Sequence, residues 1–164
     1  MRTMCVSAFG ALLIVLFSSA YAAQPVRVPE PPAEATFPAG GACPGFDVHL
    51  RTETRGWIKT FANGDIQSTG YERAWVTNVE SGKQIELVVN GRVRIIPPNG
   101  DEGLLAIAGP QIVIFFPGDV GPGDDSEART YYFKGNTQAV IDDNFAFLDF
   151  DFSGNSIDLC AELG

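Results

Sequence analysis

The stretch LLAIAGPQIVIFFP, residues 104–117, decides the fold class. Its two apolar runs, 104–108 and 111–117, show hardly any alternation of polar and apolar residues, and Gly109-Pro110 stands between them as an expected turn. Short apolar runs bounded by turn residues are typical of strands that are buried on both faces. We therefore expect these runs to be central strands of a closed barrel or of a barrel-like sandwich.

The rest of the chain from residue 46 to residue 159 has a hydrophobic period of two. No window of ten or more residues in it has helical spacing, and turn signals such as NG, SG, PPNG and SGN punctuate it. Short connections favour pairing of consecutive strands. The sequence predicts an all-β antiparallel meander of about ten strands. The expected strands lie near residues 46–53, 56–62, 66–78, 84–89, 92–97, 103–108, 111–117, 128–134, 137–141 and 145–152.

One hairpin is expected in the stretch KQIELVVNGRVRII, residues 83–96. A two-residue turn at Asn90-Gly91 would place arginines on the apolar face. A three-residue loop with Gly91 in a left-handed bulge instead pairs Ile85 with Ile95 and keeps the apolar residues together. The hydrophobic pattern therefore favours the bulged loop.

The first 22 residues have the pattern of a signal peptide. Arg2 supplies a positive charge, residues 8–17 form an uncharged apolar run, and Ala20 and Ala22 match an A-x-A cleavage site. The run is shorter than the roughly 20 residues that span a bilayer. We expect cleavage after Ala22 and a secreted, extracellular protein whose mature chain does not insert into a membrane.

Residues 23–42 are expected to be a proline-rich N-terminal tether, and residues 43–164 a single all-β domain. Proline fixes φ, favours extended geometry in the residue before it, and donates no backbone hydrogen bond. The segment is interpreted either as a disordered N-terminus or as a spacer. Its prolines are Pro25, Pro29, Pro31, Pro32 and Pro38.

Two cysteines remain when the signal peptide and its Cys5 are removed. Cys43 opens the expected domain and Cys160 closes it. An even number of cysteines in an oxidising compartment favours pairing, so a Cys43–Cys160 disulfide is predicted. A closing meander would bring its first and last strands together at this bond.

The chain is acidic, with 11 basic and 20 acidic residues and a net charge of -9. Removal of residues 1–22 takes one arginine and no acid, which leaves 10 basic residues and a net charge of -10. Such a charge repels phosphate backbones and anionic lipid headgroups. Nucleic acid is therefore not an expected partner.

An acidic loop in FFPGDVGPGDDSEART, residues 115–130, is the first candidate site. Its weak candidate metal ligands are Asp119, Asp124, Asp125 and Glu127. Their spacing does not match the alternating ligands of an EF-hand, and glycine and acids are also what an exposed loop contains. We expect an open, metal-free loop with exposed carboxylates, and no cofactor.

Two further candidates for acid–base chemistry lie on strands. Asp149 and Asp151 share one face of the strand FAFLDFDF, about 7 Å apart by strand geometry. His49 is the only histidine, and it falls on the outward side of its strand. No serine stands in a G-x-S-x-G motif, and zinc would need ligands that are not present. We interpret the aspartates as a solvated strand end and His49 as a surface residue, and no catalytic residue is assigned.

Aromatic residues form a candidate ligand-binding or sugar-stacking surface. Aromatic side chains in strands are more often part of a core. The candidates are Trp57, Tyr71, Trp75, Tyr131 and Tyr132.

Several short motifs occur in order along the chain behind the apolar N-terminus. They are ACPGFDV (42–48), STG (68–70), VTNVESGK (76–83), FPGDVGPG (116–123) and DLCAEL (158–163). In these motifs the chain resembles a group of small, uncharacterised secreted actinobacterial all-β proteins with a two-cysteine framework. The resemblance implies the fold and export, and it implies no activity.

These observations favour a secreted, noncatalytic β-domain that binds a partner or is associated with the cell envelope. Two alternatives stay open. The first is a carrier of a small apolar ligand, which requires an apolar cavity. The second is a small carboxylate-based hydrolase, which requires acids with raised pKa values in a cleft.

Overall fold

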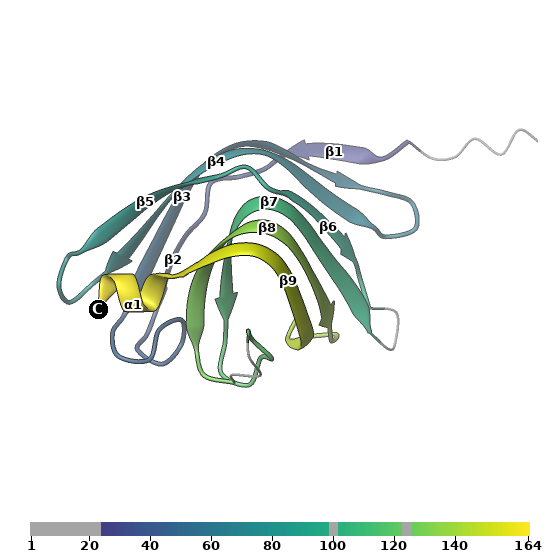
Figure 1. Cartoon of the computed structure of the whole chain (residues 1–164). Coiled ribbons are helices and arrows are strands. Elements are labelled where there is room, and N and C mark those ends of the chain that lie inside the picture. Colours follow the sequence, from purple (N-terminus) through teal and green to yellow (C-terminus); the bar gives the residue numbers. More distant parts are fainter. Residues whose placement is uncertain (1–23, 99–101, 123–125) are drawn as a thin grey trace, which may run out of the picture.

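A computed structural model describes residues 24–98, 102–122 and 126–164 (Figure 1). It forms one antiparallel sheet of nine strands and one short C-terminal helix. The all-β antiparallel prediction is therefore confirmed. The elements are β1 (Val26–Pro29), β2 (Glu34–Phe37), β3 (Val48–Thr60), β4 (Ile66–Asn78), β5 (Gln84–Val89), β6 (Arg92–Ile96), β7 (Gly103–Phe115), β8 (Arg129–Ile141), β9 (Phe147–Asp158) and α1 (Leu159–Leu163).

The sheet is open. Its strand order is β1-β3-β4-β6-β7-β8-β9, with β2 also paired to β3 and β5 also paired to β4. Among the described residues, β9 pairs only with β8, so the first and last strands do not meet. Of the two expected alternatives, a closed barrel and a barrel-like sandwich, the closed barrel is not formed by the described residues. The sheet buries its apolar residues by bending over itself, which removes the need for closure.

A row of glycines crosses the sheet. The register places Gly56 opposite Gly70, Gly109 opposite Gly135, and Gly135 opposite Gly154. Gly91 lies between Gly70 and Gly109 in this row. β5 and β6 pair with β4 in one continuous register, which places Gly91 opposite Gly70. Arg92 lies opposite Ala108 of β7, so Gly91 also lies opposite Gly109. We call these six residues the glycine row.

The glycine row lies where neighbouring backbones come too close for side chains. A Cβ on Gly70 would lie 2.3 Å from the Cα of Gly56, and one on Gly135 would lie 1.9 Å from the carbonyl oxygen of Ser153. Figure 1 shows β7, β8 and β9 as arches, and Gly109 and Gly135 are the central residues of β7 and β8. Glycine in a strand interior often marks such a bend or close approach.

Gly109-Pro110 is a bend inside one strand, so the predicted turn is wrong. β7 is continuous over 13 residues and pairs with β8 along its whole length. Gly109 has a φ of +104°, which only glycine adopts readily. The two apolar runs of the opening stretch are therefore the two limbs of one arched strand.

The predicted hairpin at Asn90-Gly91 is also wrong. β5 and β6 do not pair with each other: both pair with β4, as successive parts of one interrupted strand. Gly91 does not have a positive φ. Its backbone N–H donates to the carbonyl oxygen of Pro110 at 3.0 Å, which joins this interruption to the bend of β7.

Substitution of Gly91 tests this correction. A Cβ on Gly91 would lie 2.9 Å from the carbonyl oxygen of Pro110, so Gly91→Ala should lower the free energy of unfolding by about 1 kcal/mol through crowding. Denaturant unfolding measures the effect. Because the cause is crowding and not a positive φ, Gly91→Asn should be no better tolerated than Gly91→Ala. If Gly91→Asn were clearly more stable than Gly91→Ala, the left-handed bulge at Gly91 would be supported instead.

The bent sheet forms two nested arches, each with its own core. The inner arch of β7, β8 and β9 encloses an aromatic cluster, in which the rings of Phe115 and Phe150 are 4.8 Å apart and those of Phe133 and Phe152 are 4.4 Å apart. The outer arch of β3, β4 and β5 covers the inner one (Figure 1). A second core lies between the two arches. Its fully or nearly fully buried members are Ala42, Cys43, Phe46, Val48, Ala74, Val76, Val89, Tyr132, Leu159, Cys160 and Leu163.

The proline-rich segment, expected as a disordered N-terminus or a spacer, contains two strands that the sequence did not predict. β1 and β2 both pair with β3, at its two ends. Both strands lie at the edge of the sheet, where a missing N–H costs no internal ladder bond and proline is tolerated. β1 ends at Pro29 itself.

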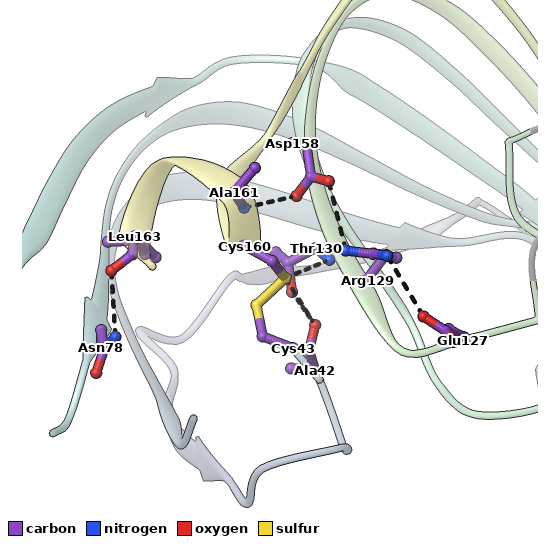
Figure 2. Close-up of a disulfide and its surroundings, with 10 residues drawn as sticks. All are labelled: Ala42, Cys43, Asn78, Glu127, Arg129, Thr130, Asp158, Cys160, Ala161 and Leu163. Atoms are coloured by element: carbon purple, nitrogen blue, oxygen red, sulfur yellow. Dashed lines mark hydrogen bonds and ion pairs between the residues drawn. A yellow bond between two sulfur atoms is a disulfide. The ribbon is translucent and has the colours of Figure 1, made fainter. Parts of the chain in front are cut away.

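The predicted disulfide is confirmed. Cys43 and Cys160 are joined across 117 residues with their Cα atoms 5.4 Å apart (Figure 2). The bond ties the loop before β3 to α1, so it links the two arches without any closure of the sheet. The backbone N–H of Thr130 donates to Cys160 Sγ at 3.3 Å, and Asn78 Nδ2 donates to the carbonyl oxygen of Leu163 at 3.1 Å.

Candidate functional site

A groove of about 270 Å³ opens on the concave side of the outer arch, beside the glycine row. Gly70 and Gly91 line it and carry no side chain to fill the space. We call this cavity the inner groove. Its apolar lining consists of Ile58, Ile66, Val89, Val93 and Ile95. A second depression of about 110 Å³ shares Glu72, Val89 and Gln111 with it and extends it towards Ile112 and Ile114 of the core.

Two carboxylates face this apolar lining. Glu30 follows β1, and its backbone N–H donates to the carbonyl oxygen of Gly56 at 3.0 Å. Its Oε2 accepts a hydrogen bond from Ser68 Oγ at 2.7 Å. The carboxylate lies over Gly56, where a Cβ would come within 2.8 Å of Oε2. The glycine row therefore makes room for the acid as well as for the groove.

The second carboxylate belongs to Glu72 on β4, opposite Thr54 of β3. Burial raises the pKa of Glu72, and the charge of Glu30 raises it further, while a hydrogen bond with the Thr52 side chain acts in the opposite direction. Thr52 is itself held in place, because its Oγ1 accepts from the backbone N–H of Ala33 at 3.0 Å. Acids with shifted pKa values in clefts are candidate functional groups.

The five aromatic candidates do not form one surface. Trp57, Tyr71 and Trp75 lie on the outer face of β3 and β4, where Trp57 is 40% and Tyr71 is 41% exposed. Tyr131 packs in the aromatic cluster, with its ring 5.9 Å from that of Phe115. Tyr132 is buried, and its hydroxyl donates to the carbonyl oxygen of Val88 at 2.7 Å.

The prediction that the carboxylates of the acidic loop are exposed is wrong for Asp119, which is only 4% exposed. Its two oxygens accept from the backbone N–H groups of Phe116 at 2.7 Å and of Phe147 at 3.0 Å. Asp119 thus ties the end of β7 to the start of β9. Glu127 is exposed and pairs with Arg129 at 3.3 Å (Figure 2). Asp124 and Asp125 lie outside the described residues.

The remaining candidates stay at the surface and outside the inner groove. Asp149 and Asp151 are exposed on β9, opposite Val140 and Gln138. His49 Nε2 lies 3.0 Å from Glu34 Oε1 of β2. Among residues 24–98, 102–122 and 126–164, no three His, Cys, Asp or Glu side chains are grouped so that they would hold a metal ion. In the same residues, no helix has the length and apolar character to cross a bilayer.

Comparisons with protein-family models, with curated proteins and with solved structures found no match to this chain. The site is therefore interpreted from its own chemistry.

Sequence reasoning missed both acids of the inner groove. Glu30 lies in the segment expected to be a tether, and Glu72 is the single acid within GYERAW. A partial signal was present for Glu72, because it has the strand parity of the buried residues Ala74 and Val76. No comparable signal exists for Glu30, which reaches the groove only because β1 pairs with β3.

Proposed function

We propose that this protein is an exported, noncatalytic binding domain that takes a small ligand with an apolar body and a positively charged group into the inner groove. The observation that carries the proposal is the position of Glu30 and Glu72 beside an apolar lining. Small-molecule sites are typically apolar clefts with a few polar groups that fix the ligand's orientation. Two carboxylates select for a cation.

Export is part of the proposal. It is supported by the expected signal peptide, by the resemblance to secreted proteins, and by the disulfide, which is compatible with an oxidising compartment.

The pKa of Glu72 gives the proposal a pH dependence. A cation binds the ionised carboxylate, so affinity should rise as the pH increases through the raised pKa of Glu72. Stability should change in the opposite direction. The folded protein holds this proton more tightly than the unfolded chain does, so the free energy of unfolding falls as Glu72 ionises.

Glu72→Gln separates binding from stability. With n-hexylamine as the probe, we expect the variant to bind about tenfold or more weakly, because a charge-assisted contact is lost. Its stability at neutral pH should be unchanged or slightly higher, since a half-buried charge is removed. Calorimetric titration and denaturant unfolding measure the two effects. Glu80→Gln removes an equal charge from an exposed turn and should change neither.

Probe chemistry distinguishes the alternatives. If n-hexanol binds as well as n-hexylamine does, the groove carries neutral apolar ligands and its acids do not select a cation. If none of n-hexylamine, n-hexanol and hexanoate binds, the inner groove is not a ligand site.

The carboxylate-based hydrolase is supported by one observation, the raised pKa of Glu72 beside Glu30. A carboxyl group with a raised pKa beside a second carboxyl group is an arrangement that general acid–base catalysis uses. Hydrolysis of a chromogenic glycoside or ester by the wild type but not by Glu72→Gln would favour this second function.

A further inference from the structure

The outer face of β1, β3 and β4 gathers basic residues on an otherwise acidic protein. These are Arg27, Arg51, Arg55, Lys59 and Arg73, which we call the cationic strip. The alternation of side chains along a strand places Arg51, Arg55 and Lys59 on one face of β3. Arg27 lies opposite Lys59. This face is the reverse of the one that bears the inner groove.

Aromatic side chains contact three of these arginines, two through the face of a ring and one through a hydrogen bond. The guanidinium of Arg27 lies 4.0 Å from the ring centre of Trp57, and that of Arg51 lies 4.9 Å from the ring centre of Trp75. Arg73 forms a hydrogen bond with the Tyr71 side chain, and this bond is the main reason why the pKa of Arg73 is raised. A stacked guanidinium keeps its N–H edges available for carboxylates and similar anions.

A polar depression of about 400 Å³ lies within the strip. Arg55, Arg73 and Tyr71 line it together with Glu53 and Thr54. The nearby acids already have partners: Glu53 contacts Arg51, and Glu86 lies 3.2 Å from Arg73. In the part of the chain that the structure describes, no ion pair joins Arg55 or Lys59 to an acid.

We propose that the cationic strip binds an anionic polysaccharide, with the depression between Arg55 and Arg73 receiving a carboxylate-bearing sugar. The strip runs along an extended strand face, which suits an extended polymer. Exposed Trp57 and Tyr71 offer aromatic surface beside the charges. The whole chain carries a net charge of -9, which opposes duplex nucleic acid, with one charge per about 1.7 Å of its axis, and anionic membranes more than a polymer with one carboxylate per sugar.

Oligogalacturonate is the probe, tested by titration against the full chain with its disulfide intact. We expect binding that weakens with added salt, and no binding of neutral dextran. The double variant Arg55→Gln/Arg73→Gln should lose about tenfold or more in affinity, because two charge-assisted contacts are removed. The matched control Lys83→Gln/Lys134→Gln removes two exposed charges, one in the turn after β4 and one on β8, and should stay within about twofold of the wild type.

Circular dichroism and thermal melting confirm that both double variants are folded. The proposal is overturned if oligogalacturonate does not bind, or if the two double variants lose affinity equally. It is also overturned if single-stranded DNA or phosphatidylglycerol vesicles bind more tightly than oligogalacturonate does, since the strip would then recognise a different class of partner.

Discussion

Gly135→Ala lowers the free energy of unfolding by about 3 kcal/mol or more, at the upper end of overpacking effects. The new Cβ would lie 1.9 Å from the carbonyl oxygen of Ser153 and 3.1 Å from the Cα of Gly154. Both neighbours are backbone, so no side-chain rotation relieves the contact. The inner arch has to open at its apex, between β8 and β9, and the aromatic cluster beneath it loses contacts.

Urea unfolding followed by fluorescence measures this loss as a lower midpoint. Gly45→Ala is the matched control, because a Cβ there meets nothing within 4 Å, and it should change stability by no more than about 0.5 kcal/mol. If Gly135→Ala does not accumulate as folded protein, Gly154→Ala provides a second reading of the same contact, with its Cβ 2.3 Å from the carbonyl oxygen of Lys134. Equal midpoints for all three variants would show that the strands do not approach closely at the glycine row.

Loss of the disulfide has the second large effect. The double variant Cys43→Ala/Cys160→Ala should be about 3–5 kcal/mol less stable than the wild type. The bond joins cysteines that are 117 residues apart, so it strongly reduces the conformational entropy of the unfolded chain. It also anchors α1, a five-residue helix that is too short to be stable alone, with Leu159 and Leu163 buried in the core between the arches.

Unfolding with and without a reducing agent measures this contribution. The reductant should lower the midpoint of the wild type to that of the double variant, and it should not change the double variant. A free-thiol count on the denatured, unreduced protein adds an independent test. Export with removal of residues 1–22 leaves no free thiol, whereas retained Cys5 contributes one. Two more free thiols would contradict the disulfide.

Local patterns predicted the class of fold and the covalent link, but they misjudged its bends. Gly109-Pro110 and Asn90-Gly91 carry the residues of turns, yet the first pair bends the continuous strand β7 and the second interrupts the strand made of β5 and β6. Glycine relieves crowding in a tight turn and in a bent strand alike. The difference depends on which backbone lies opposite, and Gly91 faces β7 only in the folded sheet.

The candidate site was less predictable than the fold. The aromatic residues expected to form one surface divide between the outer face and the two cores, because neighbouring positions such as Tyr131 and Tyr132 point to opposite sides of β8. The acids at the inner groove come from β4 and from a segment that lacked any strand pattern of its own. The prolines of β1 predict an extended backbone but not a pairing partner. The pairing of β1 with β3 in the folded sheet is what places Glu30 over Gly56.

The sequence by itself determined the antiparallel all-β class and the pairing of two cysteines. Both follow from the order and number of residues, namely a hydrophobic period of two and an even number of cysteines, and neither requires knowledge of which strands pair. Only the tertiary structure decided that six glycines align in one row, five of them within strands and Gly91 at the interruption between β5 and β6. That alignment depends on the register between strands far apart in sequence. At this row the sheet bends into nested arches, and beside Gly70 and Gly91 lies the groove that Glu30 and Glu72 face.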